Sequence, residues 1–258
     1  MLQAKLHDAL SALKMPAILE HYQSLADSAA KQKTSYSEYL LQLLEYELES
    51  RDQRARQTVL KMASLPVIKT IEDFSFKDSH IDKTLISELL TLRFVDKAKN
   101  ILLLGPSGVG KTHIALALGY AATQKRIKTK FITISDLMLQ LESSKYNSTL
   151  DNYLKRVIYS PRLLIIDEFG YIKLDATQAN WLFQVINKRY ETGSMMITSN
   201  LSFTKWQQVL NNDEALTAAI LDRLIHHSHI INITGESYRL KEKRKAGLLN
   251  MTISESTS

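Results

Sequence analysis

The sequence contains no cysteine among its 258 residues. A disulfide and a zinc site built on thiolates are therefore excluded, which suits a reducing compartment. No stretch reaches the roughly 18 consecutive apolar residues that a membrane-spanning helix needs. The first residues, MLQAKLHDALSALKMP, lack the uninterrupted apolar core of a signal peptide. We therefore expect a cytoplasmic protein with no membrane partner.

The chain carries more basic than acidic side chains. The formal net charge is +6, yet residues 1–72 carry nine basic and nine acidic side chains, so the excess belongs to the remainder. A basic surface favours a polyanionic partner such as nucleic acid. Hydrophobic residues make up 45% of the chain, enough to bury a sizeable core in one large domain or in a medium domain with an appendage.

The first third reads as helical. Leu2, Leu6, Leu10 and Leu13 lie at helical spacing, and Pro16 stands where a second helix can begin. The segment SYSE, residues 35–38, is a capping-box pattern that predicts the start of a third helix. We expect a small all-helical N-terminal domain over residues 1–70, suited to docking on a partner or on DNA.

The rest of the chain alternates between strand and helix patterns, which predicts an α/β domain with a five-stranded parallel sheet. The expected strands are 100–104, 128–134, 162–166, 194–199 and 229–233, and the expected helices are 111–125, 135–158, 175–192 and 213–227. We place this domain at 71–250 and a flexible tail at 251–258. Too few residues follow the last strand to build a C-terminal lid domain.

The stretch NILLLGPSGVGKTHIALALG fits the phosphate-binding pattern G-x-x-x-x-G-K-[ST] at every fixed position. Backbone N–H groups of such a loop surround the phosphates of ATP, the Lys111 ammonium adds positive charge, and the Thr112 hydroxyl coordinates Mg²⁺. A glycine turn with a chance Lys-Thr pair is the alternative, but the loop stands between a strand and an apolar helix. The expected nucleotide-binding residues are Gly105, Pro106, Ser107, Gly108, Val109, Gly110, Lys111, Thr112 and His113.

Two carboxylates follow the apolar strand in RLLIIDEFG, at the strand end where open α/β sheets bind ligands. Asp167 is expected to hold Mg²⁺ with Thr112. Glu168 is then placed to activate a water for attack on the γ-phosphate. Transfer to a small-molecule substrate needs no such base, so the pair favours hydrolysis, with Lys111, Asp167 and Glu168 as catalytic residues.

Two further polar residues are candidates for the same reaction. Asn200, which ends the strand MMITSN, is expected to orient the attacking water. Arg223, in the helix AAILDRLIHH, is either a solvated side chain or an arginine finger that reaches the γ-phosphate of a neighbouring subunit. His226, His227 and His229 lack a nearby cysteine or matched carboxylate, so we expect a packed helix end rather than a metal site.

Several motifs together resemble the IstB-type ATPases of bacterial insertion sequences, close relatives of the DnaC helicase loaders in the AAA+ class. They are GPSGVGKT, LLIIDEFGYIKLD, NKRYETGSMMITSN, AAILDRLIHHSHIINITGESYR and the preceding TIEDFSF. The resemblance implies an AAA+ P-loop ATPase core in a bacterial cytoplasmic protein. It also implies that Arg223 is the arginine finger, that Arg239 has a second, sensor-like role at the nucleotide, and that Arg189 lies near the subunit interface.

Two stretches are candidates for DNA contact, because basic side chains neutralise phosphates and aromatic rings pack on sugars or bases. The first pairs Lys145 with Tyr146, and the second, GYIKLD, holds Tyr171 and Lys173. Exposed loops that carry a lysine by chance remain the alternative.

We therefore expect an ATPase that assembles as an ATP-dependent homo-oligomer on duplex DNA, largely without sequence preference, and recruits or stimulates the transposase of the same element. Hydrolysis of ATP then reverses the assembly. The nearest alternative is a DnaC-like helicase loader that acts on single-stranded DNA. A small-molecule kinase and a nucleotide-gated scaffold that barely hydrolyses ATP are more distant alternatives.

Overall fold

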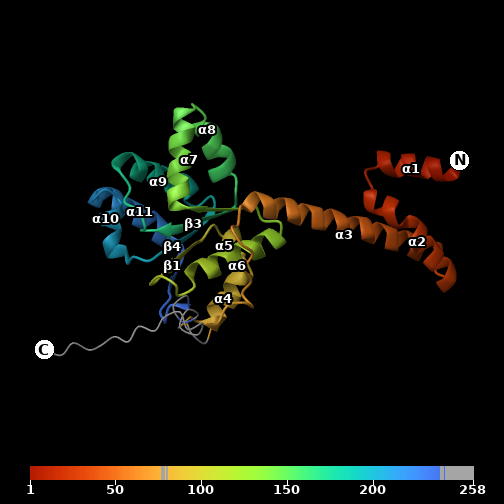
Figure 1. Ribbon diagram of the computed structural model, residues 1–258, viewed down its shortest axis with the longest axis horizontal. Helices are drawn as coiled ribbons and strands as arrows, with labels where there is room; N and C mark the ends of the chain where they lie inside the picture. Colours follow the sequence, from red (N-terminus) through yellow and green to blue (C-terminus); the bar gives the residue numbers. More distant parts are fainter. Residues whose placement is uncertain (77–78, 80, 239–240, 242–258) are drawn as a thin grey trace. The chain divides into compact units, whose positions relative to one another are not determined.

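A computed structural model of the chain describes residues 1–76, 79, 81–238 and 241 (Figure 1). The chain divides into two compact units, Met1–Thr58 and Val59–Ser258. The sequence places this division near residue 70. The structure places it earlier because Leu65 and Ile71 already pack against the core of the second unit.

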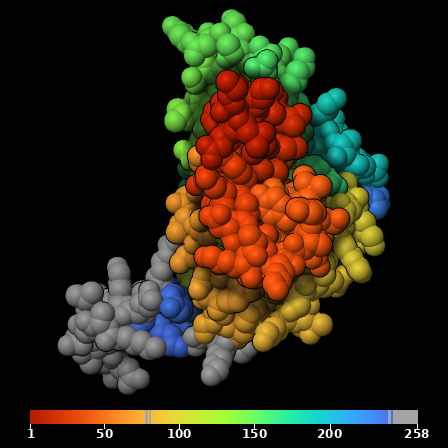
Figure 2. Space-filling model, turned by 90° about the vertical axis from the view of Figure 1, so that its right-hand side faces the viewer, coloured from red at the N-terminus to blue at the C-terminus, as the bar shows by residue number. Residues whose placement is uncertain are grey.

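The first unit is helical, as the sequence predicts. It contains α1 (Leu2–Ala12), α2 (Pro16–Gln32) and most of α3 (Tyr36–Ala63), seen in Figure 2 as the red-to-orange surface. The capping box forms at the start of α3: the Glu38 N–H donates to Ser35 Oγ over 3.3 Å, and the Ser35 N–H donates to Glu38 Oε2 over 2.9 Å. Leu10, Ile18 and Leu43 make the small core of this unit.

One buried carboxylate joins the helices of the first unit. Glu47 is only 3% exposed and accepts hydrogen bonds from the Ala17 N–H over 2.9 Å and from Arg51 Nε over 2.8 Å. Arg51 also donates to the Lys14 carbonyl. Burial opposes ionisation of Glu47, but the hydrogen bonds from Arg51, Ala17 and Ile18 outweigh it and lower the pKa of this carboxyl.

The second unit is built on a five-stranded, all-parallel sheet, which confirms the α/β prediction. Its strand order is β2-β3-β4-β1-β5, so β1 lies between β4 and β5. The strands are β1 (Asn100–Leu104), β2 (Thr129–Thr133), β3 (Leu163–Phe169), β4 (Ser194–Ser199) and β5 (Ser228–Asn232).

Helices cover both faces of this sheet and create two cores (Figure 1). One face carries α7 (Ile134–Tyr146), α9 (Ala176–Arg189) and α11 (Glu214–His226). The other face carries α4 (Lys83–Leu90), α5 (Arg93–Asp96) and α6 (Lys111–Gln124).

Some of these elements differ from the sequence prediction. The region 135–158, expected as one helical stretch, divides into α7, α8 (Leu150–Tyr153) and a π-helix (Leu154–Tyr159). The short helices α4, α5 and α10 (Trp206–Val209), together with a 3-10 turn at Phe203–Lys205, were not predicted. All are short, so they present too few periods for a helical pattern to emerge.

Parallel strands bring the segments after β1, β3 and β4 to one edge of the sheet, where ligands of open α/β sheets bind. Arg239, the tail at 251–258 and the expected absence of a lid concern residues outside the described part of the chain. Within that part, no helix has both the length and the apolar character to cross a bilayer.

Candidate nucleotide-binding site

The segment between β1 and α6 forms a tight loop at the sheet edge. Gly108 and Gly110 adopt φ values of +84° and +101°, which side chains rarely adopt, and a Cβ on Gly110 would lie 2.5 Å from the Phe74 ring. Lys111 begins α6 and turns back into the loop, where its ammonium donates to the carbonyls of Gly105 and Pro106, both over 2.7 Å. An ammonium held by loop carbonyls at the N-terminus of a helix is suited to binding a phosphate group.

Thr112 and Asp167 meet as the sequence predicts. The Thr112 hydroxyl donates to the Asp167 carboxylate, with its Oγ1 3.0 Å from Oδ1 and 3.1 Å from Oδ2. Asp167 is only 3% exposed. A hydroxyl beside a buried carboxylate offers the hard oxygen donors that Mg²⁺ prefers, so these two residues fit that ion.

Glu168 follows Asp167 but faces the opposite way. The pairing of β3 with β4 shifts register between Ile166 and Phe169, and Glu168 takes a left-handed φ of +63°. The irregularity turns the Glu168 side chain out of the sheet, where it is exposed and lines the nucleotide cavity. Two adjacent carboxylates thereby occupy different environments, one buried against Thr112 and one open to the cavity.

Thr198 on β4 connects the Asp167 carboxylate to the backbone of Glu168, and the sequence did not indicate it. Its hydroxyl donates to Asp167 Oδ1 over 2.5 Å and accepts a hydrogen bond from the Glu168 N–H over 3.0 Å. Thr198 is buried and also lines the cavity. A threonine within an apolar strand looks like an ordinary strand former, and only the pairing of β3 with β4 reveals this role.

Asn200 lies two residues after Thr198, just beyond the end of β4. Its side-chain oxygen is buried and has no hydrogen-bond partner among the described residues. It would lie 2.9 Å from a Cβ built on Gly170, and Asn200 lines a second, mostly apolar cavity beside Gly105 and Pro106. An unsatisfied buried acceptor next to the phosphate loop is available to a donor such as a water molecule.

The nucleotide cavity measures about 420 Å³, within the range of small-molecule sites. The segment 67–75, which precedes the sheet, forms one wall through Val67, Lys69, Asp73 and Phe74. His113 on α6 fixes this wall, because its ring lies edge-on to Phe74 at 5.4 Å and its Nε2 lies 2.9 Å from the Thr70 carbonyl oxygen.

The segment after β5 closes another side of the cavity. Ser237 packs against Gly108, and the Tyr238 N–H donates to the Gly108 carbonyl over 3.0 Å. Glu236 and Tyr238 line the cavity. Sequence reasoning singled out Arg239 in this segment but missed Glu236 and Tyr238, which no phosphate-binding pattern includes.

Comparison with known proteins agrees with this geometry. The sequence model of the family described as IstB-like ATP binding protein matches residues 8–246. The chain belongs to this family. It is 45% identical over 244 residues to a protein of Geobacillus stearothermophilus named as an ATP-binding protein of insertion sequence IS5376, covering 94% of this chain and 96% of the relative.

A second IstB-like relative, from Pseudomonas aeruginosa, is named as an ATP-binding protein of insertion sequence IS21. It is 44% identical over 241 residues, covering 93% of this chain and 90% of the relative. Among solved structures, DnaI matches with a TM-score of 0.54 at 20% identity, covering 69% of this chain and 92% of DnaI. AMPPCP-bound DnaA from Aquifex aeolicus matches with a TM-score of 0.53 at 17% identity, covering 71% of this chain and 57% of DnaA.

These structural matches confirm the AAA+ fold of the IstB-like chain. With the family and the assembled phosphate loop, they identify the protein as an ATP-binding AAA+ ATPase. The resemblance stated from the motifs is thereby confirmed over nearly the whole chain.

Two arginines of the IstB-like core lie away from the cavity. Arg223 on α11 donates through Nε to Asn187 Oδ1 over 2.9 Å, and its guanidinium lies 5.0 Å from the centre of the Phe183 ring. Arg189, which the resemblance places near a subunit interface, is buried within the second unit. Arg189 is 3% exposed and donates to the carbonyls of Ile158, Pro161, Arg162 and Ser194.

The four residues expected to contact DNA are all exposed in the IstB-like fold, but they differ in their contacts. Lys145 lies over the Trp181 ring at 5.5 Å, and its neighbour Tyr146 is 91% exposed. Tyr171 leans on the phosphate loop, where its hydroxyl lies 3.2 Å from Ser107 Oγ, and it lines the cavity. Lys173 lies between Tyr171 and the start of α9.

Proposed function

We propose that this ATPase is a DNA-binding regulator of transposition. It assembles on duplex DNA as an ATP-bound homo-oligomer and recruits or stimulates the transposase of the same element, and hydrolysis of ATP reverses the assembly. Membership of the IstB-like family and relatives named after insertion sequences support the link to transposition. The net charge of +6 supports a polyanionic partner.

The residues of the cavity divide the work of hydrolysis. Lys111 and the loop N–H groups bind the phosphates, and Thr112 and Asp167 hold Mg²⁺, which neutralises charge on the phosphate oxygens when bound. Glu168, open to the cavity, takes the proton of the attacking water. The unsatisfied oxygen of Asn200, at the neighbouring cavity beside the phosphate loop, orients that water, and Thr198 holds the Asp167 carboxylate and the Glu168 backbone in place.

One observation above all supports assembly: among the described residues, no arginine lines the nucleotide cavity. Besides the lysines of the cavity, an arginine from a neighbouring subunit can stabilise the charge that develops on the γ-phosphate. Arg223 is the candidate. It lies partly exposed on α11, where it contacts Asn187, the Ala219 carbonyl and the Phe183 ring.

Contact with DNA is assigned to Lys145, Tyr146, Tyr171 and Lys173. Residues that flank the two stretches meet, because Gln178 at the start of α9 donates to Glu142 on α7 over 2.7 Å. Lysines beside aromatic rings suit phosphate contacts with no base readout, so binding is expected to weaken steeply with salt.

Loading of a replicative helicase on single-stranded DNA is the second candidate function. The match to DnaI shows the fold alone and does not distinguish the two functions. The partner distinguishes them: a transposition regulator requires ATP to bind duplex DNA, whereas a loader binds single strands and a helicase.

Sedimentation of the full chain with a labelled duplex tests the proposal. We expect a large DNA-bound assembly with ATP and Mg²⁺ but not with ADP, and weaker assembly on a single strand of equal length. A monomer that ignores duplex DNA in both nucleotide states would refute the transposition function. Preference for the single strand would favour the loader.

Mixing two inactive variants tests the arginine finger. Arg223→Ala retains a complete nucleotide cavity, and Lys111→Ala retains a complete finger. If Arg223 acts on the neighbouring subunit, the mixture hydrolyses ATP faster than either variant alone, because a finger contributes about 10³-fold or more in rate. A mixture no faster than the sum of its parts would remove Arg223 from this role.

A further inference from the structure

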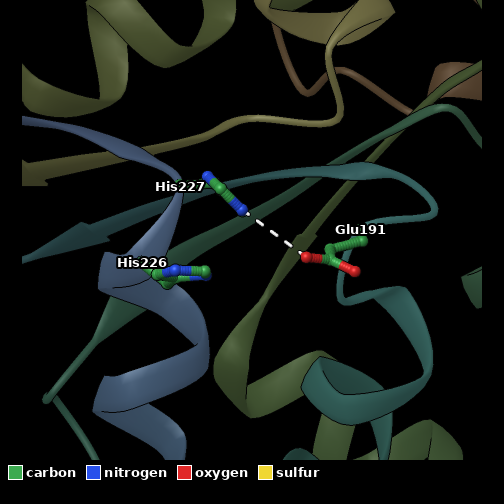
Figure 3. Close-up of side chains that lie close together, drawn as sticks. All are labelled: Glu191, His226 and His227. Atoms are coloured by element: carbon green, nitrogen blue, oxygen red, sulfur yellow. Dashed lines mark ion pairs between the residues drawn. The ribbon is translucent and has the colours of Figure 1, made fainter.

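Three metal-ligating side chains meet on the surface of the second unit, away from the nucleotide cavity. Glu191, His226 and His227 each offer one ligand atom, and these three atoms all lie within 4.8 Å of one another (Figure 3). Glu191 Oε1 lies 3.5 Å from His227 Nε2. The sequence suggests a packed helix end here, but His226 and His227 are both exposed.

Two helix ends bring these residues together. His226 is the last residue of α11 and His227 its C-cap, whereas Glu191 stands two residues after α9 with a left-handed φ of +58°. The carboxylate that meets the two histidines, Glu191, is distant along the chain, so sequence spacing does not reveal it. The packing of α9 against α11 supplies it.

The donor set is suited to a transition metal. Imidazole nitrogens bind Zn²⁺, Co²⁺, Ni²⁺ and Cu²⁺, and a carboxylate beside them adds charge, whereas Mg²⁺ prefers oxygen alone. Ligands at about 2.1 Å around a tetrahedral ion lie about 3.4 Å apart, so modest side-chain rotations from the observed spacing reach this geometry. Water completes the coordination, since the cluster faces solvent.

An outer partner is already in place. The Tyr190 hydroxyl lies 2.7 Å from His226 Nδ1. When Nε2 of His226 binds a metal, Nδ1–H donates to the Tyr190 oxygen, which fixes the orientation of the ring in the manner usual for metal-binding histidines. The rings of His226 and His227 also contact each other, with centroids 4.0 Å apart.

We propose that Glu191, His226 and His227 form a binding site for one divalent transition-metal ion, with Zn²⁺ the best-suited occupant. The site ties the end of α9 to the end of α11. One turn earlier on the same two helices, Asn187 and Arg223 are joined by a hydrogen bond. The metal ion is therefore a second cross-link between the helices, next to Arg223.

The site is tested on the untagged full chain by titration with Zn²⁺ against a chromophoric chelator. We expect one equivalent to bind to the wild type at low micromolar concentration or tighter, and a loss of affinity of at least about tenfold in Glu191→Gln and in His227→Ala. His229→Ala, on the adjoining strand, and Asp167→Asn, in the nucleotide site, serve as matched controls and should bind Zn²⁺ as the wild type does.

Co²⁺ gives a second readout, because its visible absorption reports nitrogen ligation directly. Ligand bands that appear in the wild type and in His229→Ala, but not in His227→Ala, support the site. Zn²⁺ should also raise the melting temperature of the wild type but not of Glu191→Gln. Zn²⁺ affinity that is unchanged by Glu191→Gln and His227→Ala, or no binding by about 100 μM Zn²⁺, would overturn the proposal.

Discussion

The Tyr171 hydroxyl lies 3.2 Å from the Ser107 hydroxyl oxygen, which joins the segment after β3 to the phosphate-binding loop. This segment is also the one assigned to DNA contact through Tyr171 and Lys173. Tyr171 contacts the phosphate-binding loop while lying 51% exposed, so the proposed DNA contact would reach the nucleotide site through it. The contact leads to the first prediction.

Replacing Tyr171 by Phe removes this hydrogen bond and keeps the ring. We expect basal ATP hydrolysis within about twofold of wild type and stimulation by duplex DNA reduced about fivefold, because an exposed hydrogen bond contributes about 1 kcal/mol. Steady-state hydrolysis with and without DNA measures both. Tyr146→Phe, at the fully solvated tyrosine of the other stretch, is the control and should keep its stimulation. Equal loss in both variants would show that the Ser107 contact has no special part.

Thr198 and Asn200 are predicted to differ in their effects. Thr198→Ala removes the hydroxyl between Asp167 and Glu168, so we expect a fall in kcat of about 10²-fold together with a higher Mg²⁺ concentration for half-maximal rate. Thr198→Ser keeps the hydroxyl and should recover most of the rate. Asn200→Ala should lower kcat while leaving the Mg²⁺ requirement unchanged. A wild-type Mg²⁺ dependence in Thr198→Ala would contradict the positioning role.

Arg189 is predicted to act on stability rather than on assembly. Burial lowers the pKa of its guanidinium to about 10, so it still carries its charge at neutral pH. Arg189→Met removes a donor from four carbonyls, of which that of Arg162 still accepts from the Ser194 N–H, at a cost of about 1–3 kcal/mol for each buried group left unsatisfied. We expect a melting temperature lower by well over 10 °C, followed by tryptophan fluorescence because Trp181 and Trp206 both lie in the second unit. A variant that keeps the wild-type melting temperature but fails to oligomerise would instead support a role of Arg189 at a subunit interface.

Glu47 is predicted to make the N-terminal unit sensitive to acid. Its pKa is lower in the folded than in the unfolded chain, so the folded state gains stability above the unfolded value of about 4.3 and loses it as the pH falls through the folded value. We expect the helical circular dichroism of the full chain to decline between about pH 5 and pH 3 before tryptophan fluorescence changes.

Glu47→Gln should be less stable at neutral pH and should flatten this dependence. Glu45→Gln changes an exposed carboxyl of the same helix and should leave the acid transition unchanged. An identical acid transition in Glu47→Gln and wild type would show that another carboxyl controls it.

The sequence by itself determined the elements that depend on local pattern. The alternation of short apolar segments with helical patterns predicted all five strands, and the capping-box pattern at residues 35–38 predicted the start of α3. The phosphate loop is a contiguous motif, and the Asp167–Glu168 pair follows directly on one apolar strand. Lys111, Thr112 and both carboxylates could therefore be assigned from sequence spacing.

Tertiary structure alone decided the relations between distant residues. Thr198 links the Asp167 carboxylate to the Glu168 backbone because β3 pairs with β4, and residues 67–75 form a wall of the cavity because they pack on α6. Arg189 proved to be a buried hydrogen-bond donor, and Glu191 lies beside two histidines at the end of another helix. Local pattern records which face of an element is apolar, but which elements meet is fixed by packing and by strand order.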